Sequence, residues 1–159
     1  MSWKEFDKQG ARSRDPQEAQ IRKLGLLVVD DEKEIVETLR EVFATHFDIH
    51  HATSAKAALE AFRAHGPKLV ITDQRMPEMT GLELLRQIKD IDPSTVRILI
   101  TGYSDLQTVV QALNEGLVWQ YVGKPWNLEE LRALVLRGAR RYLQEAGVDP
   151  TQYRGLLGM

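Results

Sequence analysis

Five short apolar runs, each separated from the next by a helix-like stretch, constrain the fold of this chain more than any other feature. The runs span residues 24–29, 47–52, 68–72, 96–101 and 118–122. Runs rich in Val, Ile and Leu without strict polar alternation are typical of strands buried on both faces of a parallel sheet. Apolar residues recur at helical spacing between the runs and again after Pro125. This alternation predicts a doubly wound, three-layer α/β/α fold, because right-handed crossovers put helices on both faces of the sheet.

Residues that commonly cap helices support these boundaries. Ser54, Ser104 and Asn127 stand where N-caps are expected, and Gly66 and Gly116 stand where helices should end. The capping pattern therefore predicts helices that begin after residues 54, 104 and 127.

Length and composition set the limits on function. A chain of 159 residues suits one domain, and its net charge of −2 gives no basic excess for nucleic acid. The absence of cysteine excludes thiolate chemistry and Cys-ligated metal sites, and no apolar run approaches a membrane span. We therefore expect a cytoplasmic protein with a domain over residues 24–147, a flexible or weakly helical arm over residues 1–23, and a tail or linker start over residues 148–159.

Polar side chains follow four of the predicted strands. Asp30 and Asp31 come after the first strand, Asp73 after the third, Thr101 ends the fourth, and Lys124 comes after the fifth. The carboxyl ends of parallel strands share one edge of a sheet, so these groups should converge. Three close carboxylates repel one another and favour a hard cation such as Mg²⁺, for which Mn²⁺ can substitute. A carboxylate beside Mg²⁺ and a lysine is a credible nucleophile towards a phosphoryl group.

Each of these groups also has an ordinary structural explanation. An acidic pair after a strand complements the dipole of the following helix, and Lys124-Pro125 can be a surface lysine before a helix. Their joint occurrence at four strand ends is what favours a site. A haloacid-dehalogenase-like phosphatase would need an acid at position 75, where Arg75 stands. A nucleotide-binding Rossmann protein would need a glycine-rich turn where Asp30-Asp31-Glu32 stands.

Several motifs in the chain match one known family. They are Val29-Asp30-Asp31-Glu32, Asp73-Gln74-Arg75-Met76-Pro77, Thr101-Gly102 and Lys124-Pro125. Together they resemble the receiver domain of bacterial two-component response regulators, over about residues 24–145. The resemblance implies a flavodoxin-like receiver fold with strand order 2-1-3-4-5. Two positions depart from the family pattern: Thr80 replaces a common acidic residue, and Gly123 replaces a larger one.

The resemblance also implies roles for individual residues. Asp73 would accept a phosphoryl group from a sensor histidine kinase, while Asp30, Asp31 and Asp73 would bind Mg²⁺ with the backbone carbonyl of Arg75. Lys124 would contact the phosphoryl group. Such a receiver catalyses its own phosphoryl transfer and autodephosphorylation and is not a classical enzyme.

The family also implies a switch. Thr101 would move towards the phosphoryl group, and Tyr121 would turn inward, which changes the face formed by the fourth helix, fifth strand and fifth helix. We expect a homodimer or an effector to use this face. Trp119 is expected either to lie in it or to be partly covered by the fourth helix. Arg75 and Tyr103 are expected to tune the loss of the phosphoryl group by limiting water access.

The stretches around Thr101-Gly102-Tyr103 and Trp119-Gln120-Tyr121 indicate a narrower similarity. They resemble receivers of hydrogenase-type and nitrogen-type transcriptional regulators, and receivers joined to HD-type phosphodiesterases. The output is therefore expected to be a detached effector domain or direct protein contact, without nucleic-acid binding by this chain. A degenerate receiver that acts only as an interaction module is the alternative.

Overall fold

The computed structural model describes residues 23–102, 105–149, 151 and 153. The predictions for the arm before residue 23, for Tyr103 and for the cap at Ser104 lie outside these residues. The described elements are β1 (Leu24–Val29), α3 (Lys33–Phe43), β2 (Phe47–Ala52), α4 (Ala55–His65), β3 (Leu69–Asp73), α5 (Gly81–Ile91), β4 (Val96–Thr101), α6 (Leu106–Asn114), β5 (Gln120–Gly123) and α7 (Leu128–Glu145).

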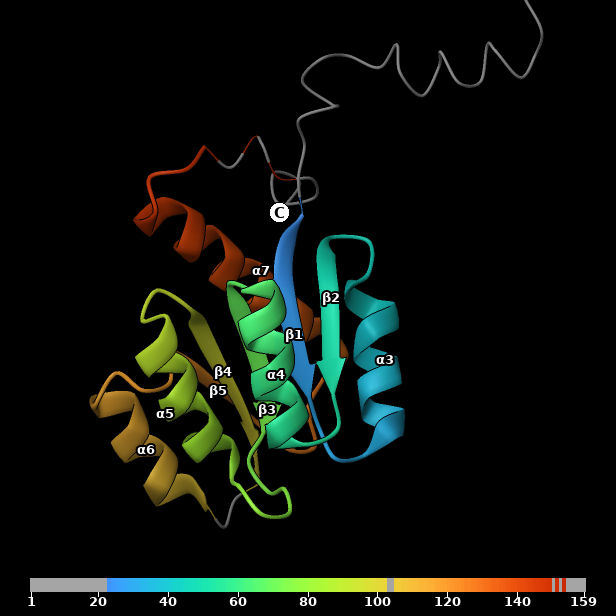
Figure 1. The fold of residues 1–159 in the computed structure, drawn as a ribbon, viewed down its shortest axis with the longest axis vertical. Helices are drawn as coiled ribbons and strands as arrows, with labels where there is room; N and C mark the ends of the chain where they lie inside the picture. The colour runs from blue at the N-terminus through green and yellow to red at the C-terminus, as the bar shows by residue number, and fades with distance from the viewer. Residues whose placement is uncertain (1–22, 103–104, 150, 152, 154–159) are drawn as a thin grey trace, which may run out of the picture.

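The strands form one parallel sheet in the order β2-β1-β3-β4-β5, which confirms the predicted topology. All five strands run in the same direction, so their carboxyl ends lie together at the lower edge of Figure 1. The order reverses between β1 and β3, where a doubly wound sheet ordinarily binds its ligand.

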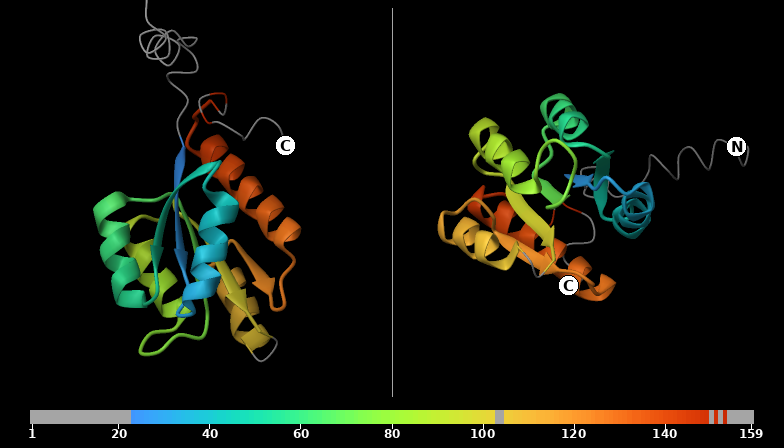
Figure 2. Two further views of the ribbon diagram at one scale, coloured as in Figure 1. Left: turned by 90° about the vertical axis from the view of Figure 1, so that its right-hand side faces the viewer. Right: turned by 90° about the horizontal axis from the view of Figure 1, so that it is seen from below.

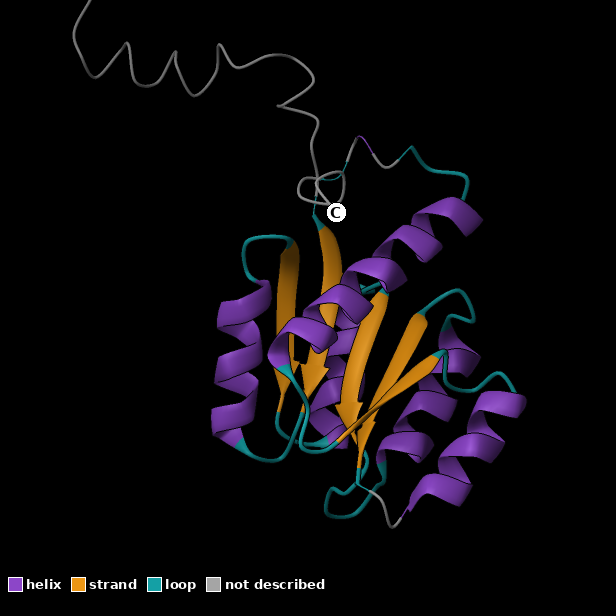
Figure 3. Ribbon diagram, turned by 180° about the vertical axis from the view of Figure 1, so that it is seen from behind, coloured by secondary structure: helices purple, strands orange, loops and turns teal. Residues whose placement is uncertain are grey.

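Helices cover both faces of the sheet, as predicted. Helices α3 and α7 lie over one face, which is turned towards the viewer in Figure 3, and α4, α5 and α6 lie over the other. Neighbouring residues of β1 point to opposite sides: Leu26 and Val28 enter the first core cluster, while Leu27 and Val29 enter the second. Because helices cover both faces, the central strands β1, β3 and β4 are buried at almost every position, whereas the edge strands β2 and β5 are partly exposed.

Side-chain caps define the helix starts that the sequence predicted. The Ser54 hydroxyl accepts a hydrogen bond from the backbone N–H of Ala57, and the Asn127 side chain accepts one from that of Glu130. Gly66 ends α4 with φ of 58°, a left-handed conformation that glycine adopts without steric cost.

Two strand boundaries differ from the prediction. The third strand begins and ends one residue later, so Asp73 belongs to β3 itself. The fifth strand begins at Gln120, two residues later than expected. The N–H groups of Leu117 and Val118 donate to the carbonyl of Ala112 at the end of α6, at 2.9 and 3.4 Å, rather than to β4. The Arg97 guanidinium also holds this turn, since it donates to the carbonyls of Leu117 at 2.8 Å and Gly116 at 3.2 Å.

None of the described helices is long and apolar enough to cross a membrane.

Candidate functional site

The carboxyl edge of the sheet brings the predicted polar residues together, and Figure 2 (right) looks onto this edge. Asp30 directly follows β1, Asp73 ends β3, Thr101 ends β4 and Lys124 directly follows β5. One carboxylate oxygen from each of Asp30, Asp31 and Asp73 lies within 4.8 Å of the others. Asp30 and Asp73 are buried, whereas Asp31 is exposed at the mouth of the site.

Lys124 forms an ion pair with Asp73 across the edge of the sheet. Its ammonium nitrogen Nζ lies 2.8 Å from Asp73 Oδ1. The backbone of Lys124 is fixed as well, because its N–H donates to the carbonyl of Thr101 at 2.8 Å. Burial by itself lowers the pKa of Lys124, but the hydrogen bond and the charge of Asp73, with help from Asp30 and Glu32, outweigh burial and raise it. Lys124 is therefore a firmly protonated cation beside the Asp73 carboxylate.

Asp30 has an unsatisfied buried oxygen. Its Oδ1 accepts a hydrogen bond from the backbone N–H of Glu32 at 2.9 Å, while Oδ2 has no hydrogen-bond partner among the described residues. Burial raises the pKa of Asp30 to about 6, and the charges of Asp73 and Asp31 add to the rise, while the Glu32 hydrogen bond and Lys124 oppose it. A buried carboxylate oxygen without a partner is costly, and a bound cation would remove that cost.

The donor set fits a magnesium ion. Three carboxylates and a neighbouring backbone offer only oxygen ligands, which a small hard cation prefers. The orphaned Oδ2 of Asp30 supplies an acceptor for such an ion.

The chain after Asp73 is held by contacts that the sequence analysis missed. The backbone N–H of Gln74 donates to the carbonyl of Ile100 at 2.9 Å, and the Gln74 side-chain oxygen accepts from the N–H of Leu82 at 2.9 Å. A Cβ on Gly81 would lie 2.3 Å from the carbonyl oxygen of Asp73. Only glycine permits this approach, so the start of α5 is pressed against the backbone of Asp73. In the sequence, the glycine that follows Met79-Thr80 was the feature that could have indicated this contact.

Thr101 and Tyr121 lie on a shared cavity. The Thr101 side chain is buried, and its hydroxyl donates to the carbonyl of Gly102 at 3.3 Å. Tyr121 is 37% exposed. Both residues line a cavity of about 410 Å³, together with Leu106, Lys124 and Pro125. This space connects the polar edge with the surface formed by α6, β5 and the start of α7.

Trp119 packs differently from both expectations. It is partly buried against the cluster under α3 and α7, and its Cζ3 atom lies 3.0 Å from where a Cβ of Gly138 would stand. The prediction that the fourth helix, α6, covers it is therefore wrong, because the missing side chain of Gly138 leaves room for the indole against α7. The exposed apolar residues of the predicted switch face are instead Leu106, Val110, Tyr121 and Leu128.

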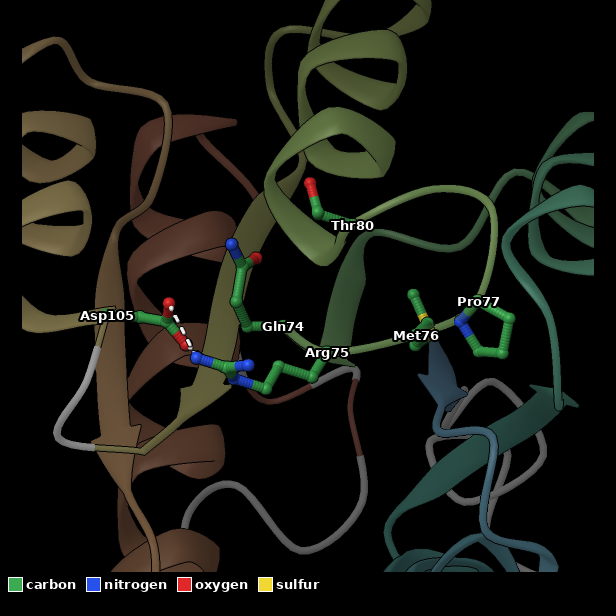
Figure 4. Close-up of a pocket in the computed structure, with 6 residues that line it drawn as sticks. All are labelled: Gln74, Arg75, Met76, Pro77, Thr80 and Asp105. Carbon is green, nitrogen blue, oxygen red and sulfur yellow. Dashed lines mark hydrogen bonds and ion pairs between the residues drawn. The ribbon is translucent and has the colours of Figure 1, made fainter.

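Arg75 reaches from the loop after β3 to the start of α6. Its Nε lies 3.2 Å from Asp105 Oδ2, and the two side chains face one another in Figure 4. Both border a cavity of about 470 Å³ that is also lined by Gln74, Met76, Pro77 and Thr80.

Comparison with known proteins agrees with this arrangement. The family model of the response regulator receiver domain matches residues 26–136. The hydrogenase transcriptional regulatory protein HoxA of Bradyrhizobium diazoefficiens is 35% identical over 132 residues, which cover 78% of this chain and 27% of that protein. The DNA-binding transcriptional regulator NtrC of Escherichia coli is 34% identical over 134 residues, which cover 80% of this chain and 27% of that protein.

A solved structure gives the same result for the fold. The signal receiver domain of an HD domain-containing protein from Pseudomonas fluorescens superposes with a TM-score of 0.72 and 32% identity, over 79% of this chain and 93% of that one. The chain spans about a quarter of the length of the curated relatives it matches. With the sheet order and the matched residues, these similarities show that the chain belongs to the family of response regulator receiver domains.

Proposed function

We propose that this receiver domain accepts a phosphoryl group on Asp73 from a sensor histidine kinase and passes the signal on through the face formed by α6, β5 and α7. The observation that carries the proposal is the 2.8 Å ion pair between Lys124 and Asp73, set beside two further carboxylates. A purely structural salt bridge between Lys124 and Asp73 does not explain the two further carboxylates, because three clustered acids repel one another.

The transfer is a displacement at phosphorus. A carboxylate oxygen of Asp73 attacks the phosphorus of a phosphohistidine, a new O–P bond forms, and the N–P bond breaks. The bonding electron pair returns to the imidazole nitrogen. Lys124 balances the negative charge of the transferred group, and its contact with Asp73 supports that role. Loss of the phosphoryl group to water would return the receiver to its resting state.

Asp30 and Asp31 are the residues proposed to hold Mg²⁺ or Mn²⁺ with Asp73 and the backbone carbonyl of Arg75. The buried, unpaired oxygen of Asp30 supports this assignment. The bound ion would neutralise charge on the phosphoryl oxygens.

The proposed switch couples Thr101 to Tyr121. In the unphosphorylated structure the Thr101 hydroxyl donates to the carbonyl of Gly102. A phosphoryl group on Asp73 would add three acceptor oxygens, and the hydroxyl could donate to one of them by moving inward. The cavity of about 410 Å³ between these residues gives the Tyr121 ring room to follow. Its turning would alter the exposed apolar surface of Leu106, Val110 and Leu128.

A dimer partner or an effector is proposed to bind this apolar surface. The names of the relatives HoxA and NtrC support a transcriptional output, and that of the Pseudomonas neighbour supports an HD-type output. The alternative, a degenerate receiver that signals only by contact, is disfavoured because the acidic cluster and Lys124 are all present.

Intact mass spectrometry tests the proposal. The protein is incubated with acetyl phosphate, with and without Mg²⁺, beside the Asp73→Asn variant. We expect one phosphoryl group on the wild type, only with the metal, and none on Asp73→Asn. Equal gains in both proteins would contradict the assignment of Asp73. For the switch, Tyr121→Ala should still gain the phosphoryl group but lose the phosphorylation-dependent change in hydrogen exchange of α6 and β5, and an unchanged response would contradict the role of Tyr121.

A further inference from the structure

The ion pair between Arg75 and Asp105 joins the loop after Asp73 to the first turn of α6. Arg75 Nε lies 3.2 Å from Asp105 Oδ2, and Arg75 Nη2 lies 3.5 Å from Asp105 Oδ1 (Figure 4). The Arg75 side chain is 72% exposed and that of Asp105 is 20% exposed. Exposed ion pairs are weak, so this one can be exchanged for another partner.

Asp105 stands at the N-cap position of α6 but does not cap it. The caps of α4, α5 and α7 are Ser54, Thr80 and Asn127, and each accepts a hydrogen bond from the backbone N–H three residues later. The side chain of Asp105 makes no such bond, although aspartate is among the best capping residues. Its carboxylate pairs with Arg75 instead, and its backbone, at φ −106° and ψ 10°, is not in the extended conformation of the other three caps.

Arg75 likewise has an alternative partner once Asp73 is phosphorylated. The two residues are separated only by Gln74, so the new dianionic group would form beside the loop that carries Arg75. A guanidinium binds phosphoryl oxygens through two parallel, charge-assisted hydrogen bonds. The phosphoryl group would therefore compete with Asp105 for the same donors.

We infer that Asp105 is a positioning residue that keeps Arg75 away from the phosphoacceptor, and that phosphorylation exchanges the partners of both. Arg75 moves to the phosphoryl oxygens, and the freed Asp105 adopts the extended backbone of the other caps, so that its carboxylate caps α6 through the N–H of Thr108. The inference rests on the proposed phosphorylation of Asp73. It adds a second connection between Asp73 and α6, separate from the Thr101 hydroxyl.

The exchange also controls how long the phosphoryl group persists. In hydrolysis, a water oxygen bonds to phosphorus, the O–P bond to Asp73 breaks, and its electron pair stays on the carboxylate. The protons of the water leave with the phosphate and the solvent. Arg75 on the phosphoryl oxygens obstructs the approach of that water, so Asp105 shortens the lifetime by holding Arg75 back.

A double-mutant cycle tests the exchange through phosphoryl lifetime. Wild type, Asp105→Asn, Arg75→Gln and the double variant are loaded with acetyl phosphate and Mg²⁺, desalted, and followed by intact mass. We expect Asp105→Asn to lengthen the lifetime about two- to five-fold, the range of an exposed ion pair, and Arg75→Gln to shorten it. In the Arg75→Gln background, Asp105→Asn should have no effect. Asp90→Asn, an exposed aspartate on α5, is the matched control and should leave the lifetime unchanged.

Hydrogen exchange supplies a second readout. The amide of Thr108 should exchange more slowly in the phosphorylated wild type than in the unphosphorylated protein, because it gains a cap. An unchanged lifetime in Asp105→Asn, or equal lengthening with and without Arg75, would overturn the inference while leaving phosphorylation of Asp73 intact. A wild type that takes up no phosphoryl group would instead overturn the proposed function.

Discussion

Lys124 and Asp73 form an ion pair of 2.8 Å although β4 lies between the strands that carry them. The Lys124 side chain reaches over the end of β4, and its backbone is hydrogen-bonded to Thr101 at that same end. The pair thus ties the proposed phosphoacceptor to the two strands that carry the proposed switch residues.

Replacing Lys124 by Gln should slow phosphoryl uptake about 10²-fold, the usual cost of losing one group that stabilises developing charge. The rate of mass gain with acetyl phosphate and Mg²⁺ measures this. Lys56→Gln changes an exposed lysine on α4 and serves as the control. Equal uptake rates in the two variants would contradict the role given to Lys124.

The metal-free protein should lose stability as the pH rises from about 4 to about 6. The pKa of Asp30 is raised from 3.8 to about 6 in the folded state, so in this window the folded chain holds a proton that the unfolded chain has lost. Above the folded pKa the loss is complete, at about 1.4 kcal/mol for each pKa unit, or on the order of 3 kcal/mol. Urea unfolding in EDTA at several pH values measures the slope.

Asp30→Asn should remove this pH dependence and stabilise the metal-free protein near neutral pH, while Asp90→Asn should keep the wild-type slope. Adding Mg²⁺ should stabilise the wild type above about pH 6, where Asp30 is ionised, and should stabilise Asp30→Asn far less. An identical slope in wild type and Asp30→Asn would show that burial of Asp30 does not cause it.

Gly81→Ala should destabilise the domain by about 1–3 kcal/mol, the cost of overpacking. The added methyl group would lie 2.3 Å from the carbonyl oxygen of Asp73 and would push α5 away from β3. Gly123→Ala is the matched control, because a Cβ at that position meets no atom within 4 Å. Chemical denaturation of both variants makes the comparison, and equal losses would contradict the close approach at Gly81.

Arg97→Met should cost about 2–4 kcal/mol. The buried guanidinium donates to the carbonyls of Leu117 and Thr95 at 2.8 Å and to two further carbonyls, and methionine would leave these acceptors unsatisfied. Arg86→Met removes an exposed arginine whose contact with Glu115 is long, at 3.9 Å, and should cost below about 1 kcal/mol. Similar midpoints for the two variants in urea would contradict this assignment.

The sheet and its polar edge were predictable from sequence because both depend on local patterns. Apolar runs indicate strands that are buried on both faces. The carboxyl ends of parallel strands lie at the same edge of the sheet, so the residues that follow them lie close together. Asp30, Asp73 and Lys124 could therefore be grouped without coordinates. The strand order came from the family resemblance.

The contacts that the sequence did not predict join segments whose partners are not encoded locally. The turn before β5 is hydrogen-bonded to the end of α6 and to the Arg97 guanidinium, so β5 starts later than its apolar run predicts. Trp119 packs against Gly138 because that glycine lacks a side chain. The spacing of apolar residues in the sequence does not indicate this contact. The ion pair between Asp105 and Arg75 joins two loops 30 residues apart, and no local pattern in the sequence indicates it.

Locating the phosphoryl group tests the central claim most directly. The protein is loaded with acetyl phosphate and Mg²⁺, the acyl phosphate is reduced with borohydride, and the peptides are mapped by mass spectrometry. Reduction converts the phosphorylated aspartate to homoserine. The account predicts homoserine at position 73 alone. Homoserine at position 30 or 31, or an unmodified Asp73 in protein that carries the phosphoryl group, would contradict it.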